Sequence, residues 1–216
     1  MDYYPVFLDL KKRPVLVVGG GKVAEGKVHG LLGAGAVISL VAPQLTDTLR
    51  DLVTAGSIRH TPREYKSTDL DGQATCFVAT DDGAINARVA EDCRARGIWV
   101  NAADDSANCD FILPAVVRNG KIVVAASTGG ASPAMARRLR EELTAFLDED
   151  YAPLTDLLAE VRAEVRSAAM KVDPERWQDA IDATLRTLIA QGRIDEARDR
   201  LRLTLGVEPS PTRREG

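Results

Sequence analysis

The sequence predicts an α/β protein whose first part is a Rossmann-like parallel sheet with helices on both faces. The apolar run Pro14–Val18 has the length and the β-branched content of a buried parallel strand. It leads into three successive glycines, residues 19–21, and then into helix-forming residues. Further along, short apolar runs alternate with helical segments, a pattern that favours right-handed crossovers and a parallel sheet.

The glycine turn matches the pattern of a dinucleotide-binding fold. Gly19, Gly21 and Ala24 occupy the three small positions of G-x-G-x-x-G/A. In that pattern the first glycine makes a tight turn, the second lets the backbone approach a pyrophosphate, and the third packs the helix on its strand. Glycine turns without a ligand are common, but here strand, turn and helix follow in the required order. The helix N-terminus would then attract the anion.

The first half of the chain divides into strands and helices of ordinary length. We expect helices over residues 23–34, 44–55 and 86–96, and strands over 36–41, 58–65, 75–79 and 98–101. Ligands of such sheets bind outside the carboxyl ends of the strands. Residues 19–21, 42–44, 80–82 and 101–105 should therefore lie along one edge.

The pattern changes after residue 110. Apolar residues 115–117 and 122–126 flank a hairpin-like turn, and Ser132 and Pro133 are suited to begin a helix. Helical periodicity starts at Tyr151, continues over 177–188 and ends with a helix over 194–203. The predicted parts are a nucleotide-binding domain (1–113), a small α+β segment (114–150), a helical domain (151–208) and a disordered tail (209–216).

Composition restricts the class of protein. The chain has 216 residues, of which 45% are hydrophobic and 28% charged, and a net charge of -4, which argues against nucleic acid as a partner. No apolar run approaches the roughly 18 residues of a membrane span, and the first residues do not resemble a signal peptide. We therefore expect a cytoplasmic protein without membrane contact. Three cysteines without C-x-x-C spacing and two distant histidines, His29 and His60, predict neither a disulfide framework nor a bound metal.

Five short motifs occur in a fixed order at residues 4–8, 17–24, 79–82, 109–115 and 127–133. The last two, Cys-Asp-Phe-Ile-Leu-Pro-Ala and Ser-Thr-Gly-Gly-Ala-Ser-Pro, are the most specific. In these motifs the chain resembles the precorrin-2 dehydrogenase family, the first module of siroheme synthases. The resemblance implies an NAD-binding domain, a dimerisation segment over 114–150 and a helical end, assembled as a homodimer. It also implies oxidation of the tetrapyrrole precorrin-2 to sirohydrochlorin and, in many members, insertion of Fe²⁺.

The resemblance places the catalytic base at Asp104, which follows a strand at the cofactor edge. Oxidation releases a proton and metal insertion displaces two, so each step needs a base near the macrocycle. Turn propensity alone favours a different interpretation, in which Asp104 is a turn residue or helix cap. Asp105 is a second candidate for the same role.

The predicted cofactor contacts come from the ends of three strands. They are Gly19, Gly21, Lys22, Val23, Ala42, Pro43, Gln44 and Thr80. No Asp or Glu ends the second strand to bind a ribose 2′-hydroxyl, so backbone groups around residues 42–44 are expected to do so. The choice of NAD over NADP therefore rests on the resemblance.

A substrate with many carboxylates needs a positive surface on this acidic chain. Guanidinium groups bind carboxylates through paired hydrogen bonds. We expect Arg118, Ser127, Thr128 and Arg137 to contact the substrate. For any single arginine, a solvated helix face paired with acidic neighbours explains the sequence equally well.

The leading interpretation is a homodimeric, NAD-dependent dehydrogenase of precorrin-2, with Fe²⁺ insertion as an additional activity. The alternative is a non-catalytic module that senses NAD(H) and passes the signal through its helical end. Asp104 and the motifs at 109–115 and 127–133 favour catalysis, because simple sensing does not require them.

Overall fold

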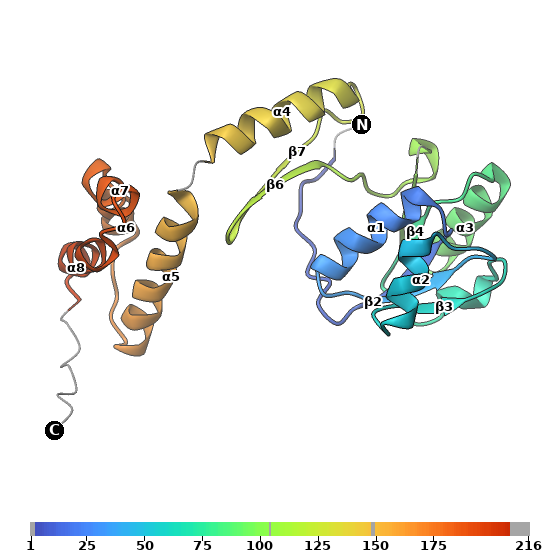
Figure 1. Cartoon of the computed structure of the whole chain (residues 1–216), viewed down its shortest axis with the longest axis horizontal. Coiled ribbons are helices and arrows are strands. Elements are labelled where there is room, and N and C mark those ends of the chain that lie inside the picture. The colour runs from blue at the N-terminus through green and yellow to red at the C-terminus, as the bar shows by residue number, and fades with distance from the viewer. Residues whose placement is uncertain (1–2, 104, 148–149, 208–216) are drawn as a thin grey trace. The chain divides into compact units, whose positions relative to one another are not determined.

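The chain folds as two compact units, which divide between Leu113 and Pro114 (Figure 1). The structure is a computed structural model and describes residues 3–103, 105–147 and 150–207. The first unit holds a parallel sheet, and the second holds a β-hairpin and a series of helices. Each unit has its own hydrophobic core.

The sheet of the first unit has the strand order β3-β2-β1-β4-β5. The strands are β1 (Pro14–Val18), β2 (Val37–Val41), β3 (Arg59–Thr61), β4 (Thr75–Val78) and β5 (Trp99–Ala102). Strand β1 pairs in parallel with β2 on one side and with β4 on the other. The order therefore reverses at β1, and ligands of open α/β sheets bind at such a switch point. The predicted Rossmann-like sheet is confirmed.

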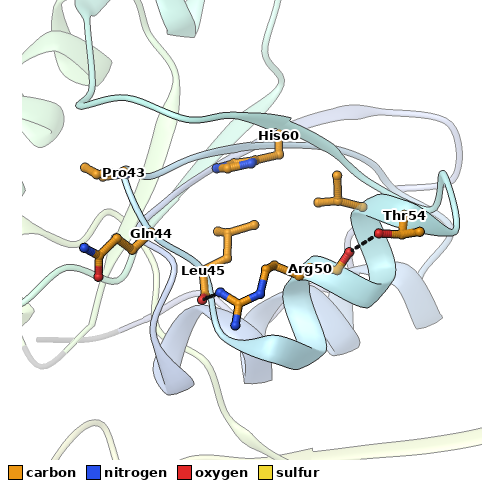
Figure 2. Close-up of a pocket in the computed structure, with 7 residues that line it drawn as sticks. Pro43, Gln44, Leu45, Arg50, Thr54 and His60 are labelled. Carbon is orange, nitrogen blue, oxygen red and sulfur yellow. Dashed lines mark hydrogen bonds between the residues drawn. The ribbon is translucent and has the colours of Figure 1, made fainter.

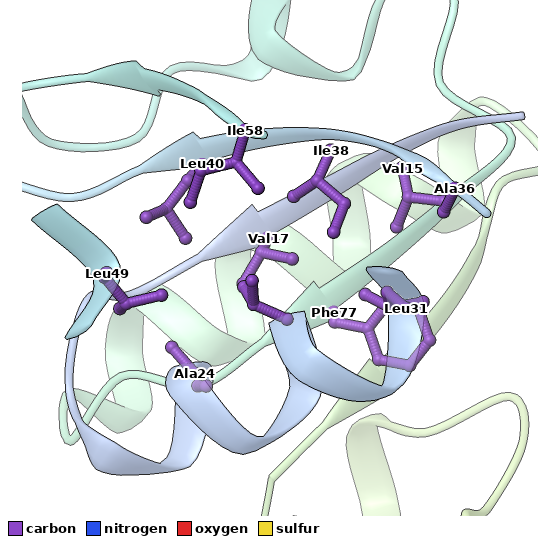
Figure 3. Close-up of a cluster of buried hydrophobic side chains, with 12 residues drawn as sticks. Val15, Val17, Ala24, Leu31, Ala36, Ile38, Leu40, Leu49, Ile58 and Phe77 are labelled. Carbon is purple, nitrogen blue, oxygen red and sulfur yellow. The ribbon is translucent and has the colours of Figure 1, made fainter. Parts of the chain in front are cut away.

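Helices cover both faces of this sheet because the side chains of β1 alternate between two cores. Val15 and Val17 pack with α1 (Lys22–Gly33) and α2 (Asp47–Thr54), in the cluster that Figure 3 shows. Leu16 packs on the other face with α3 (Gly83–Ala95) and the 3₁₀ turn η1 (Ser67–Leu70). All three side chains are fully buried. Burial of each contributes about 1.5–3 kcal/mol, which fixes the helices over the strands.

In the first unit, two helix starts differ from the prediction by three residues. Helix α2 begins at Asp47 rather than at residue 44, because the Thr46 hydroxyl accepts the Leu49 N–H and caps the helix. The Thr46 N–H itself donates to the Gly20 carbonyl at 3.0 Å. Helix α3 begins at Gly83 rather than at residue 86, because the Asp82 carboxylate accepts backbone N–H groups of the first turn. Both caps lie beside the carboxyl edge of the sheet.

The second unit starts with the antiparallel strands β6 (Ala115–Asn119) and β7 (Ile122–Ala126). Gly120 makes their turn with a φ of 57°, and a β-carbon there would lie 2.9 Å from the Ala152 β-carbon. Helix α4 (Pro133–Phe146) follows, with the Ser132 hydroxyl accepting the Met135 N–H as the predicted cap. No residue of α4 is buried.

The rest of the described chain is helical. Helix α5 (Tyr151–Ser167) packs with α8 (Ile194–Leu205) and α7 (Ala183–Ala190) around Leu157, Val161, Leu185 and Leu201. The helix predicted over 177–188 is instead two helices, α6 (Pro174–Ala180) and α7, because the Asp182 carboxylate accepts the Leu185 N–H and starts a new helix. The predicted tail, residues 209–216, lies outside the described residues. None of the described helices has the length and apolar character that crossing a membrane requires.

Candidate functional site

The three glycines after β1 have different surroundings. A β-carbon on Gly19, whose φ is 116°, would lie 2.2 Å from the Ala79 carbonyl oxygen, and one on Gly20 would lie 2.0 Å from that of Gln44. Both distances are too short for any real contact, so the protein's own packing requires these two glycines. A β-carbon on Gly21 would meet no heavy atom within 4 Å. The space beside Gly21 is therefore open to a ligand.

Gly21 also precedes the N-terminus of α1. It caps the helix without a side-chain acceptor, so the first-turn N–H groups remain directed at the space beside it. These N–H groups and the helix dipole favour an anion. An open position at the second glycine of the motif, directly before a twelve-residue helix, has the features of a pyrophosphate site.

Lys22, the next residue, is paired and yet accessible. Its ammonium lies 3.1 Å from the Glu25 carboxylate, and 79% of its side chain is exposed. The Thr46 hydroxyl donates to the same carboxylate at 2.8 Å. Together the hydroxyl and the ammonium hold the pKa of Glu25 below its ordinary value. Glu25 thereby links the start of α1 to the cap of α2.

The end of β2 holds the next predicted contacts. Ala42 is buried, its N–H donates to the Thr61 carbonyl, and its carbonyl accepts from His60 Nε2 at 2.9 Å. The backbone groups of Ala42 are thus already engaged, and Pro43 has no N–H to donate. The exposed side chain of Gln44 is therefore the group best suited to reach a ligand here. A pocket of about 440 Å³ lies at this point, and Figure 2 shows the residues that line it. Pro43, Gln44, Leu45, Arg50, Val53, Thr54 and His60 line it.

A second pocket, of about 390 Å³, lies at the carboxyl ends of β4 and β5. It brings together Val23 from the start of α1, Thr80 from the end of β4, and Asp105 from the turn after β5. Ala79, Asp81, Gly83, Asn86 and Ala103 complete its lining. Residues from three separate segments thus meet at one edge of the sheet, as the parallel topology requires.

Thr80 is held in place by Asn86, a residue that the sequence analysis missed. The Thr80 hydroxyl donates to Asn86 Oδ1 at 2.6 Å, and Asn86 Nδ2 donates to the Thr80 carbonyl at 3.1 Å. Asn86 is only 6% exposed. Its one signal in the sequence is its position four residues after the Asp82 cap, because side chains four residues apart lie on the same face of a helix.

The turn after β5 carries the acidic residues. Asp104, the predicted base, lies outside the described residues. Asp105 lines the second pocket, and its Oδ2 accepts from Asn108 Nδ2 at 2.7 Å. The specific motif that follows ties the turn to the sheet, since the Asp110 carboxylate accepts the Val100 N–H at 2.9 Å. A carboxylate is therefore present at the pocket.

The predicted substrate residues all belong to the second unit. The Ser127 hydroxyl accepts the Gly129 N–H, and the Thr128 hydroxyl bonds to both the N–H and the carbonyl of Ser132. These two side chains therefore shape the loop between β7 and α4. Arg118 on β6 and Arg137 on α4 are exposed and form no ion pair with any described residue. The alternative interpretation, in which an arginine of this helix pairs with an acidic neighbour, holds for Arg138, whose guanidinium lies 2.7 Å from the Glu142 carboxylate.

Histidines and cysteines form no metal cluster within the described part of the chain. His29 Nδ1 lies 2.8 Å from the Glu25 carbonyl, and His60 donates to Ala42. The three cysteines are free, and two of them are buried.

Comparison with known proteins shows similarity along both units. Residues 6–115 match a family described as putative NAD(P)-binding, and residues 119–145 match one described as sirohaem biosynthesis protein central. The siroheme synthase of Photobacterium profundum is 35% identical over 212 residues, which are 97% of this chain and 45% of that protein. The siroheme synthase of Methylococcus capsulatus is 39% identical over 199 residues, which are 91% of this chain and 42% of that protein. The chain thus spans less than half the length of these relatives.

One similar solved structure matches in length as well. It is SirC, a precorrin-2 dehydrogenase, which is 31% identical and superimposes with a TM-score of 0.74. The match covers 92% of this chain and 100% of that one. Both the sheet and the helical unit therefore have counterparts in a single solved protein.

Proposed function

The chain belongs to the precorrin-2 dehydrogenase family, and from this we propose that it oxidises precorrin-2 to sirohydrochlorin with NAD⁺. The observation that carries the proposal is the glycine turn, where packing requires Gly19 and Gly20 but leaves Gly21 open. Such an opening beside uncapped helix N–H groups suits a dinucleotide pyrophosphate. When bound, NAD⁺ supplies the acceptor for a hydride from the macrocycle.

The residues present fit this cofactor. The N–H groups that follow Gly21 hold the pyrophosphate, and Pro43 and Gln44 contact the adenosine half. Val23 and Thr80 contact the nicotinamide half in the second pocket, where Asn86 orients the Thr80 hydroxyl. Gly19 and Ala42 are packed against the protein interior, and their backbone positions the loops that make these contacts. The side chain of Lys22 is exposed, and its ammonium is proposed to contact the phosphates.

The preference for NAD over NADP is proposed from the likeness to the precorrin-2 dehydrogenase family, and Arg50 does not decide it. An arginine near the end of the second strand commonly accommodates the 2′-phosphate of NADP. Here the Arg50 guanidinium pairs with Asp47 and donates to the Leu45 carbonyl. Both side chains are exposed, Arg50 to 59% and Asp47 to 91%, so solvent screens the pair and it does not by itself exclude a 2′-phosphate.

The proposed base is Asp104, with Asp105 as the alternative. Hydride removal leaves a proton on the macrocycle, and a carboxylate beside the pocket accepts it. The position of Asp105 in the pocket lining supports a base in this turn. The same carboxylate would accept pyrrolic protons if Fe²⁺ is inserted as a second substrate. Arg118, Ser127, Thr128 and Arg137 are proposed to bind the substrate's carboxylates.

The proposed assembly is a homodimer formed through the second unit. Helix α4 is amphipathic, with Met135, Leu139, Leu143 and Phe146 at spacings of three and four, and yet no residue of it is buried. It lies beside the two-stranded sheet of β6 and β7, and a hairpin of this size is marginally stable by itself. A second copy would bury both surfaces.

The three free cysteines are typical of a reducing compartment, and we propose the cytoplasm.

The deciding experiment is incubation of the protein with precorrin-2 and NAD⁺. We expect sirohydrochlorin and NADH to appear in equal amounts by absorbance, and a lower rate with NADP⁺. Absence of both products, with folded protein, would remove the dehydrogenase assignment. Tight binding of NAD⁺ without turnover would favour the sensing alternative. Adding Fe²⁺ to sirohydrochlorin, with and without protein, tests metal insertion separately.

A further inference from the structure

Three polar side chains outside the pocket lining connect α1 to the turn after β5. Lys27 on α1 donates to Asn101 Oδ1 at 2.7 Å, and its ammonium lies 5.6 Å from the centre of the Phe77 ring. Asn101, at the end of β5, is only 6% exposed. A partly buried ammonium that reaches a buried amide is costly unless the contacts are well made. The contact therefore ties α1 to the last residues of β5.

Asn101 is fixed on its other side as well. Its Nδ2 donates to the Phe111 carbonyl at 2.9 Å and lies 3.7 Å from the Cys109 sulfur. Because the ammonium of Lys27 can only donate, the amide oxygen must face α1 and the amide nitrogen must face the 109–111 segment. The amide thus joins the helix to the specific motif that follows the turn.

Cys109 completes the connection by contacting Ala102 and Asp105, the residues on either side of the turn. Its Sγ accepts the Ala102 N–H at 3.2 Å and lies 3.1 Å and 3.3 Å from the carbonyl oxygens of Ala102 and Asp105. Two carbonyl oxygens near one sulfur suit a thiol, whose proton they share, and would repel a thiolate. Burial also raises the pKa of this thiol above its ordinary value. Cys109 is therefore a protonated structural contact.

We propose that Lys27, Asn101 and Cys109 form a clamp that holds Ala102 and Asp105 and thereby positions Ala103 and Asp105 at the second pocket. The clamp residues do not line the pocket, whereas Ala103 and Asp105 do. They therefore act as positioning residues: they affect the reaction only by holding the acidic turn in place. The catalytic part of this inference rests on the proposed function, because Asp104 and Asp105 are its candidate bases. A misplacement of about 1 Å in such a group costs a factor of about 100 in rate.

The test combines two readouts on Lys27→Met and Cys109→Ala in the full chain. Hydrogen exchange should speed up at least about fivefold for backbone N–H groups of residues 102–108, and stay unchanged in β1 and β4. The kcat should fall at least about tenfold, while the Kd for NAD⁺ stays within about twofold. Lys27→Arg, which keeps the charge and a donor, should recover part of the rate. Lys171→Met, an exposed lysine of the second unit, is the matched control and should change neither readout.

The outcomes separate this clamp from the proposed function. Unchanged exchange over 102–108 in both variants would overturn the clamp. Faster exchange with wild-type kcat would also overturn it, since the position of the turn would then not govern the rate. If the wild-type protein does not oxidise precorrin-2, the proposed function fails. The exchange measurement then decides by itself whether these residues position the turn.

Discussion

The backbone of Gly20 lies against the carbonyl of Gln44, so closely that a β-carbon on Gly20 would lie 2.0 Å from that oxygen. The contact joins the glycine turn after β1 to the loop between β2 and α2. It is reinforced by the Thr46 N–H, which donates to the Gly20 carbonyl. Two loops that both face the proposed cofactor are thereby held as one surface.

This contact and the opening at Gly21 predict different effects for two neighbouring substitutions, one on stability and the other on cofactor binding. Gly20→Ala should lower the free energy of unfolding by about 3 kcal/mol, because the clash is with backbone that cannot turn away. Gly21→Ala should cost less than about 1 kcal/mol, since its φ of -86° suits alanine and nothing is near. It should nevertheless weaken NAD⁺ binding at least about tenfold, by obstructing the pyrophosphate. Urea unfolding and NAD⁺ titration measure the two effects. Equal losses of stability would contradict this division of roles.

The proposed base predicts a loss of rate without a loss of binding. Asp104→Asn keeps the size of the side chain but removes its proton acceptor, so kcat for precorrin-2 should fall at least about a hundredfold. The Kd for NAD⁺ should stay within about twofold. Asp105→Asn is the matched comparison and should retain most of the rate, because the Asp105 carboxylate is already engaged by Asn108. Steady-state kinetics that show the reverse order would transfer the role to Asp105.

The proposed dimer predicts that one charge on α4 separates the subunits. Met135 is 47% exposed, so Met135→Glu is compatible with a folded single chain but not with an apolar interface. Sedimentation should show a dimer for the wild type and a monomer for the variant, with unchanged circular dichroism. Leu203→Glu, at a residue of α8 that is 82% exposed, is the control and should remain dimeric. A monomeric wild-type protein would refute the assembly itself.

The ion pair between Arg63 and Asp69 predicts how stability depends on pH. The guanidinium binds both carboxylate oxygens, at 2.8 Å and 2.6 Å, and holds the pKa of Asp69 below its ordinary value. A carboxylate with a lowered folded-state pKa stabilises the protein above its unfolded pKa of about 3.9, and this contribution is lost as the pH falls through the folded value. Asp69→Asn should therefore cost about 1–3 kcal/mol at pH 7, and the difference from wild type should shrink below about pH 4.

The control for this prediction is Asp71, which is 69% exposed and lies 3.8 Å from Arg96. Asp71→Asn should change the free energy of unfolding by less than about 0.5 kcal/mol, because an exposed pair is screened by solvent. Urea unfolding at neutral and acid pH measures both variants. A pH-independent loss in Asp69→Asn would show that its role is packing rather than charge.

The sequence alone predicted the sheet, the glycine turn and the edge at which the strand ends meet. These features depend on local signals: the unbroken apolar run of β1, the glycines after it, and the order of strands and helices. The starts of α2 and α3 were placed wrongly, because the deciding interactions are side-chain caps at Thr46 and Asp82 rather than periodicity. The break between α6 and α7 has the same cause.

The chain by itself determined the parallel α/β architecture and the family motifs, because spacing along the backbone encodes which face of each element is apolar. Only the tertiary structure distinguished Gly20 from Gly21, since the two differ in what lies across the turn and not in chemistry. It alone joined Lys27 to Asn101, which are 74 residues apart, because a long-range hydrogen bond depends on how α1 packs over the sheet. Short-range patterns therefore set the framework, and packing between distant segments decided which side chains shape the pocket.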